Sequence, residues 1–176
     1  MESEMREPKP EELRWAPSAV SVPHIVPIPQ ALWMQCARFD REIFGPDAWA
    51  ESVWKSELAN PDRLYLMIQE NPAPHRSIGR LLALGGISLY EDCELLTLAV
   101  APSVRRRGYA TSVLLELIDA ARAAGSKQMF LEVRAHDTGA QRLYAHLGFE
   151  RLGVRKRYYS DDDALTMRLS LKESDA

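Results

Sequence analysis

The sequence is poor in the features that mark secreted, metal-binding and membrane-spanning proteins. Its only cysteines, Cys36 and Cys93, lie far apart and match no metal-ligand spacing, so they suit reduced thiols in the cytosol better than a disulfide scaffold. No apolar run approaches the roughly 20 residues that span a bilayer. The acidic N-terminal stretch MESEMREPKPEELR also lacks the apolar core of a signal peptide. We therefore expect a soluble cytoplasmic protein with no metal and no membrane partner.

The chain also has no excess of positive charge. The formal net charge is −3, so the chain as a whole is not expected to bind nucleic acid, and any basic function must be local. Neither the triphosphate-binding pattern G-x-x-x-x-G-K-[ST] nor the dinucleotide-binding pattern G-x-G-x-x-G occurs. The content of 46% hydrophobic and 27% charged residues is typical of a globular domain.

Prolines divide the chain into unequal parts. Six of them lie between residues 8 and 29, where each fixes a backbone angle and removes a donor. We predict an extended arm over residues 1–29, which could be a solvated tail or could lie with its second half along a sheet edge. The apolar residues for that edge are Val22, Ile25, Val26 and Ile28. A single domain is expected over residues 30–171, followed by a short tail, 172–176.

Hydrophobic periodicity within the domain predicts alternating helices and strands. Helices are expected over residues 31–44, 50–58, 109–124 and 140–147. Strands are expected over residues 63–69, 78–90, 93–100, 128–133, 149–159 and 164–171, and Gly85-Gly86 suggests a bend or bulge in the second of them. The succession 93–100, 109–124, 128–133 is a strand–helix–strand unit with parallel strands. The predicted fold is α/β (α+β), a single mixed sheet of six or seven strands flanked by helices.

The stretch APSVRRRGYAT (101–111) joins an apolar strand to a helix. A helix start carries free N–H groups and partial positive charge, Gly108 lets the backbone approach a ligand, and the arginines match phosphate oxygens. Two other interpretations remain open for the residues alone. The arginines could be a solvated surface run, or a nucleic-acid contact, although no aromatic side chains are interleaved with them.

The segment LTLAVAPSVRRRGYATSVLLELI resembles the acetyl-coenzyme A signature of the GNAT N-acetyltransferase superfamily, with Arg105, Gly108 and Ala110 on its fixed positions. The segments FLEVR, AQRLYAHLGFERLGVRKRYY and ALTMRL resemble the RimI-type branch, which modifies the N-terminal alanine of a ribosomal protein. The resemblance covers roughly residues 31–170. It implies acetyl-CoA as cosubstrate and an acceptor protein or peptide N-terminus as partner, and it leaves the oligomeric state open.

The resemblance also implies two catalytic residues. Glu132 matches the general base that takes the proton of the amine, although by itself it could be an exposed or salt-bridged strand residue. Tyr144 matches the general acid that protonates the departing thiolate, although its helical spacing also fits a core aromatic. No covalent enzyme intermediate is implied, because the amine attacks directly.

Further residues are implied as contacts. Residues expected to bind the cofactor are Leu98, Ala99, Val100, Arg105, Arg106, Arg107, Gly108, Tyr109, Ala110 and Thr111. Asp137 stands where many relatives have an asparagine, so it is either a cofactor contact that has lost the amide donor or an ordinary helix N-cap. For the acceptor, candidates are Tyr158, Tyr159 and Arg155, in a loop that could equally be a basic strand and polar turn. Phe44, Trp49 and Trp54 could wall the other side of the channel or pack in the core.

Three functional alternatives remain: a GNAT enzyme for a small molecule, one for lysine side chains, and a module that binds acetyl-CoA without turnover. The presence of both Glu132 and Tyr144 favours an enzyme.

Overall fold

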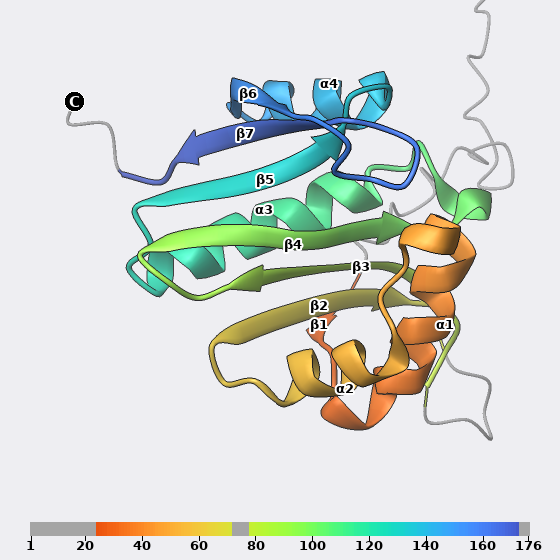
Figure 1. Cartoon of the computed structure of the whole chain (residues 1–176). Coiled ribbons are helices and arrows are strands. Elements are labelled where there is room, and N and C mark those ends of the chain that lie inside the picture. Colours follow the sequence, from red (N-terminus) through yellow and green to blue (C-terminus); the bar gives the residue numbers. More distant parts are fainter. Residues whose placement is uncertain (1–23, 72–77, 173–176) are drawn as a thin grey trace, which may run out of the picture.

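Seven strands form one mixed sheet in the computed structural model, which describes residues 24–71 and 78–172 (Figure 1). Their spatial order is β1-β2-β3-β4-β5-β7-β6, and only the β4–β5 pair is parallel. The strands are β1 (Ile25–Pro27), β2 (Arg63–Gln69), β3 (Leu81–Ser88), β4 (Asp92–Val100), β5 (Gln128–Arg134), β6 (Glu150–Arg155) and β7 (Ala164–Ser170). The mixed sheet of the sequence prediction is therefore confirmed.

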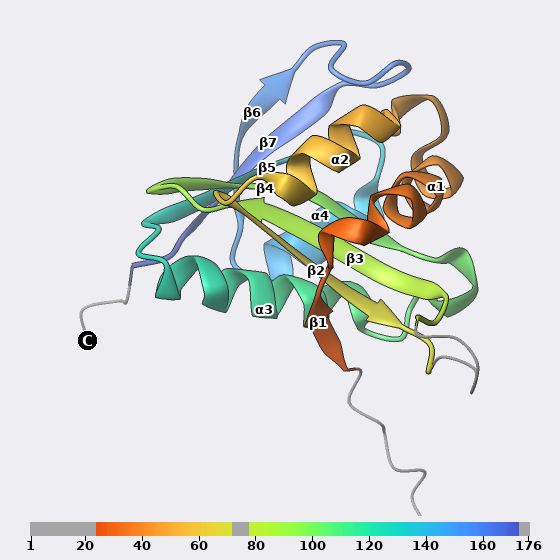
Figure 2. The same ribbon diagram turned by 90° about the horizontal axis from the view of Figure 1, so that it is seen from below.

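Four α-helices cover the sheet, α1 (Trp33–Phe44) and α2 (Glu51–Ala59) on one face and α3 (Tyr109–Ala123) and α4 (Thr138–His146) on the other (Figures 1 and 2). Helices α1 and α3 bury most of the apolar stripe that predicted them, whereas α2 buries only Trp54 and α4 only Tyr144. In α3 the buried residues are Val113, Leu114, Leu117, Ile118 and Ala121. None of the described helices is long and apolar enough to cross a bilayer.

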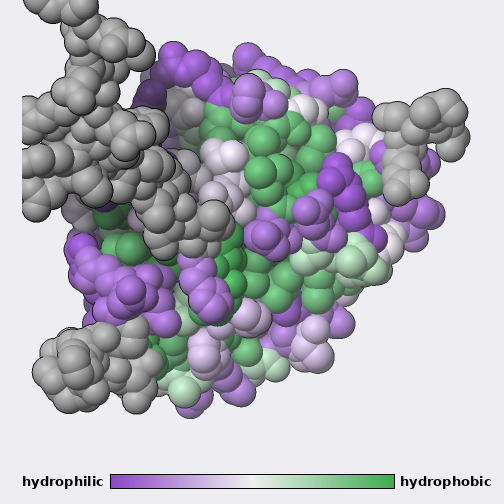
Figure 3. Space-filling model, turned by 180° about the vertical axis from the view of Figure 1, so that it is seen from behind, coloured by the Kyte–Doolittle hydropathy of each residue, from purple (hydrophilic) through white to green (hydrophobic). Residues whose placement is uncertain are grey.

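The rear of the molecule is not uniformly polar. On the face seen from behind, hydrophobic residues gather in the middle and hydrophilic residues lie toward the rim (Figure 3). Exposed apolar side chains on the described elements include Leu115 of α3 and Leu152 of β6.

Of the two expectations for the N-terminal arm, the sheet edge and not the solvated tail is found for the residues that can be compared. Ile25 pairs with Ile68 and Val26 with Met67, and Ile28 is buried just after β1 ends. Val22 lies outside the described residues. The chain before residue 30 therefore contributes the first edge strand.

The Gly85-Gly86 pair is required by close packing rather than by a turn. A Cβ on Gly86 would lie 2.1 Å from the Tyr65 ring, and one on Gly85 would lie 2.9 Å from Val113 of α3. The predicted irregularity is present beside it, because Gly86 pairs with Thr97 while Ile87 pairs with Leu95. The extra residue, Leu96, belongs to β4. The predicted bulge was thus placed on the wrong strand of the correct pair.

Strands β4 and β5 pair only at their beginnings, Asp92–Glu94 with Gln128–Phe130. Beyond these residues the two strands diverge, as Figure 1 shows. Beyond Glu94, β4 keeps its pairing to β3 and β5 keeps its pairing to β7. The sheet is therefore split in its middle, and backbone groups of β4 are left unpaired along the split.

The two cysteines are buried free thiols, and burial raises the pKa of Cys36 to about 12 and that of Cys93 to about 11, from an ordinary value of 9.0. Since the unfolded chain loses these protons near pH 9 and the folded chain keeps them, their stabilisation is complete below about pH 9 and is lost as the pH rises toward 11–12. We expect the free energy of unfolding, measured by urea titration, to fall steadily above about pH 9.

The double variant Cys36→Ala, Cys93→Ala is the control, because it should show a shallower fall over the same pH range. An unfolding free energy that stayed constant up to about pH 11 would contradict the burial of both thiols.

Candidate active site

The split between β4 and β5 opens into a cleft of about 430 Å³. One wall is Leu95–Val100 of β4, the other is Glu132–Arg134 of β5, and α1 closes one end with Asp40, Ile43 and Phe44. Because the divergent strands cannot bond to each other here, the cleft has polar backbone on its walls and room for an extended molecule.

A second cavity, of about 630 Å³, lies around the start of α3 and the inner side of α4. It is lined by residues of the arginine loop, including Arg105, Arg106, Gly108 and Thr111, and by Leu143 and Tyr144 of α4. Five residues line both cavities: Leu98, Val100, Arg105, Ala140 and Tyr144. The two cavities therefore adjoin at the end of β4.

The arginine loop presents backbone N–H groups at the start of α3. Gly108 is the helix N-cap with φ +82°, and no side chain caps the helix. Arg106 also has a positive φ, +63°, an unusual conformation for a residue with a Cβ. The guanidinium Nε of Arg105 donates to the carbonyl of Val100 at 3.2 Å, which fixes the loop to the end of β4. The first turn of α3 is thus free to receive an anion.

Glu132 lies on the cleft-facing side of β5, between the buried residues Leu131 and Val133. Its side chain is 19% exposed and accepts a hydrogen bond from Arg155 Nη1 at 2.5 Å. The Arg155 guanidinium also stacks on the Tyr158 ring, 4.6 Å from its centre. The salt-bridged state considered for Glu132 therefore exists, with Arg155 of β6 as its partner.

Tyr144 lies at the junction of the two cavities and is 7% exposed. Its ring packs edge-on against Phe149 at 5.7 Å, so it is also part of the core. Burial raises the pKa of its hydroxyl, and the nearby Tyr159 and Asp137 raise it further. The hydroxyl is therefore neutral near pH 7 and available as a proton donor.

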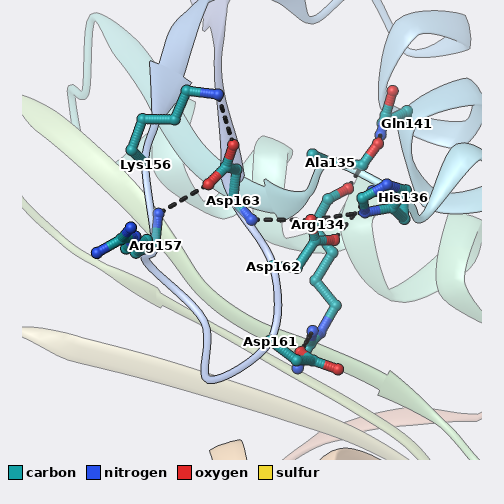
Figure 4. A network of polar contacts seen from close by, with 9 residues as sticks. All are labelled: Arg134, Ala135, His136, Gln141, Lys156, Arg157, Asp161, Asp162 and Asp163. Atoms are coloured by element: carbon teal, nitrogen blue, oxygen red, sulfur yellow. Dashed lines mark hydrogen bonds and ion pairs between the residues drawn. The ribbon is translucent and has the colours of Figure 1, made fainter.

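The loop between β6 and β7 closes the far side of the cleft and is fixed by three aspartates (Figure 4). Asp161 pairs with Arg134, Asp162 with His136, and Asp163 with Lys156 and the backbone N–H of Arg157. These contacts explain why β6 ends at Arg155 and not at residue 159 as predicted, because the aspartates fold the following residues back toward β5.

The same loop brings Tyr159 to the cleft. Its hydroxyl donates to the Glu132 carbonyl at 3.1 Å, and the Arg134 guanidinium stacks on its ring, 4.5 Å from the centre. Arg134 also pairs with Asp47, which follows α1. One arginine therefore joins β5, the β6–β7 loop and the end of α1 around the cleft.

Most of the residues singled out from the sequence line one of the two cavities, and four do not. Arg107 is exposed and Tyr158 is exposed beside Arg155, while Trp54 is fully buried in the core. Arg155 contacts the site only through Glu132. Trp49 and Phe44 do line the cleft. The Asp137 Oδ1 atom accepts a hydrogen bond from the backbone N–H of Ala140 at 2.9 Å, so Asp137 is the N-cap of α4, one of its two predicted roles.

Sequence reasoning missed three charged residues of the cleft, Asp40, Asp47 and Arg134. A signal existed for one of them, because Asp40 lies four residues after Cys36 on the buried face of α1. Among the described residues, no group of three or more His, Cys, Asp or Glu side chains is arranged to hold a metal ion.

Comparison with known proteins agrees with this architecture. The family model described as the acetyltransferase (GNAT) family matches residues 30–149. The N-alpha-acetyltransferase RimI of Mycobacterium tuberculosis is 36% identical over 142 residues, which cover 76% of this chain and 84% of that protein. The ribosomal protein bS18-alanine N-acetyltransferase of Haemophilus ducreyi is 38% identical over 89 residues, covering 48% of this chain and 61% of that protein.

Solved structures show the same fold. The ribosomal-protein-S18-alanine N-acetyltransferase of Escherichia coli superposes with a TM-score of 0.75 at 24% identity, over 86% of this chain and 95% of that one. The structure of Arabidopsis thaliana NAA60 in complex with acetyl-CoA also superposes with a TM-score of 0.75, at 17% identity, over 84% of this chain and 97% of that one. With the family match spanning more than half of its length, this chain belongs to the GNAT family and is an N-acetyltransferase of the RimI type.

Proposed function

We propose that this acetyltransferase uses acetyl-CoA to acetylate a protein N-terminal α-amino group, with the N-terminal alanine of a ribosomal protein as its acceptor. The observation that carries the proposal is the meeting of the two cavities at Tyr144, with Glu132 on the wall of one and the arginine loop on the wall of the other. Several relatives are named for the acetylation of ribosomal protein bS18 alanine. The enzyme would therefore act in the cytoplasm, where ribosomal proteins are made.

The residues of the second cavity fit coenzyme A. Free N–H groups at the start of α3 and the exposed Arg105 and Arg106 suit a pyrophosphate. The unpaired edge of β4 at Leu98–Val100 suits the amides of a pantetheine chain, which would lie beside it as an added strand. When bound, acetyl-CoA supplies an activated acetyl thioester.

The residues of this chain then have separate roles. A main-chain N–H near Val100 would donate to the thioester carbonyl, and Glu132 would take the proton of the amine, directly or through a water. Tyr144 would give its hydroxyl proton to the departing sulfur. Tyr158 and Tyr159 would line the path of the acceptor peptide, with Tyr159 nearer the cleft.

An α-amino group suits a site with a single carboxylate base. Its pKa of about 7.8 is some 2.6 units below that of a lysine ammonium, a difference of about 3.5 kcal/mol in the cost of neutralising it. This difference favours a protein N-terminus over a lysine side chain as acceptor.

Gly108→Val is expected to weaken coenzyme A binding by about tenfold or more. A valine at φ +82° is strained, and its side chain would occupy the open space in front of the helix start. The measurement is the dissociation constant of coenzyme A by calorimetry.

The matched control is Gly125→Val. Gly125 also has a positive φ, +86°, with open space around its Cβ position, but it follows α3 at the opposite end of the helix. This variant should lose comparable stability and keep its affinity for coenzyme A. Equal affinity losses in both variants would mean that strain, and not the loop, determines binding.

The function itself is tested by incubating the protein with acetyl-CoA and a panel of acceptors while free thiol is followed. The panel contains peptides beginning with alanine, the same peptides with a blocked N-terminus and an internal lysine, and polyamines. Turnover restricted to free alanine N-termini is expected. Turnover on lysine or polyamines alone would replace the proposal with another GNAT activity. Tight cofactor binding without turnover would indicate a binding module.

A further inference from the structure

Asp40 is a buried carboxylate at the end of the cleft formed by α1. It is 2% exposed, yet it is one of the residues that line the cleft. Its Oδ2 accepts the backbone N–H of Trp49 at 2.7 Å. The indole N–H of Trp54 lies near enough to lower the pKa of this carboxyl, but no hydrogen bond of normal geometry joins the two.

No described cation compensates the charge of Asp40. The titratable groups that it influences, Cys36 and Tyr65, are neutral near pH 7. The two basic residues that line the cleft are engaged elsewhere, Arg105 with the Val100 carbonyl and Arg134 with Asp47 and Asp161. Burial therefore raises the pKa of Asp40, the expected result for a carboxylate removed from water without a counter-ion.

The other carboxylates of the cleft already have partners. Their contacts are Asp47 with Arg134, Glu132 with Arg155, and Asp137 with the N–H of Ala140 at the start of α4. Asp40 and Asp137 each accept a backbone N–H and pair with no cation, but Asp137 is exposed, so Asp40 is the one buried acid among the described residues of the cleft wall without a cationic partner. An unpaired buried carboxylate costs folding free energy, so a cationic ligand would relieve that cost.

We propose that Asp40 binds the positively charged amino group of the acceptor at the α1 end of the cleft, whose β5 wall carries Glu132. Asp40 is then an acceptor-binding residue that selects amines by charge, and Glu132 removes the proton once the amine is held. The inference rests on the proposed function, because it assumes that the acceptor enters the β4–β5 cleft with a free amine. Trp49, fixed by Asp40, would form the apolar side of the same subsite.

The test compares two peptides that differ only in this amine. One begins with alanine and the other carries a propionyl group in its place. Their dissociation constants are measured by calorimetry with coenzyme A present, at about pH 6.5, where an α-amino group of pKa about 7.8 is charged. The wild-type protein should bind the alanine peptide at least about tenfold more tightly than the propionyl peptide.

Asp40→Asn should remove this preference and leave the affinity for the propionyl peptide unchanged. The asparagine carbonyl can still accept the Trp49 N–H, so the loop is preserved, while the charge is lost. Asp119→Asn, an equal charge change at an exposed residue of α3, is the matched control and should behave as wild type.

Three results would overturn the inference. Asp40→Asn could lower the affinity for both peptides equally, which would make Asp40 a purely structural residue. It could also leave both affinities unchanged. A wild-type protein that bound the two peptides equally would overturn it without any variant, even if Asp40→Asn failed to fold. If the wild type acetylates a lysine or a polyamine and no N-terminus, the proposed function is wrong, and the same comparison with that amine and its hydroxyl analogue still tests Asp40.

Discussion

Glu132→Gln is expected to lower kcat by at least about a hundredfold with little change in the affinity for coenzyme A. The amide keeps the shape of the side chain and its position on β5, but it cannot accept a proton from the acceptor amine. Steady-state rates with an alanine peptide and calorimetry with coenzyme A give the two quantities.

The fold should survive this change. Glu132 loses its ion pair with Arg155, but the Arg155 side chain is 62% exposed, and an ion pair with so exposed a partner contributes about 1 kcal/mol or less. The matched control is Glu150→Gln on β6, where an exposed glutamate pairs with Arg168 at 3.4 Å. An unchanged kcat in Glu132→Gln would remove the carboxylate from the mechanism.

Tyr144→Phe is expected to lower kcat by at least about tenfold, again with coenzyme A affinity little changed. The variant removes the only group of this side chain that can protonate a thiolate, and the phenyl ring keeps its contact with Phe149. A thiolate with a pKa near 8.5 is already a fair leaving group, so the effect should be smaller than that of losing the base.

The stability of this variant separates catalysis from packing. Burial and nearby charges, and no hydrogen bond, account for the raised pKa of Tyr144, so removal of the hydroxyl costs little folding free energy. Tyr90→Phe, at an exposed turn away from both cavities, is the control. If Tyr144→Phe kept its kcat, the protonation of the sulfur would have to be assigned elsewhere. If it lost stability instead, the residue would be mainly a core aromatic.

Much of the fold could be predicted because its signals are local. The stripes of α1, α3 and α4 and the alternation of β5 follow from helical and strand periodicity within single segments. Gly125 and Gly148 have the positive φ expected of residues that end a helix. The motif order from residue 93 to residue 170 likewise indicated the family without any knowledge of contacts.

The errors and omissions concern contacts between distant segments. The bulge was predicted on β3 because its glycines are visible in the sequence, whereas the extra residue is Leu96, whose position depends on the register between two strands. The length of β6 depends on three aspartates that bind residues of β5 and of the loop. Neither could be obtained from the periodicity of one segment.

The sequence by itself predicted most of the sheet and helix pattern, the family and the arginine loop, because each rests on residues close together in the chain, and the family resemblance implied Glu132 and Tyr144. Only the tertiary structure decided which side chains meet: that Arg155 pairs with Glu132, that Arg134 joins Asp47 to the β6–β7 loop, and that Asp40 is buried without a cation. The physical reason is that charge pairing depends on distance in space, and the split between β4 and β5 brings together residues that lie far apart in the chain.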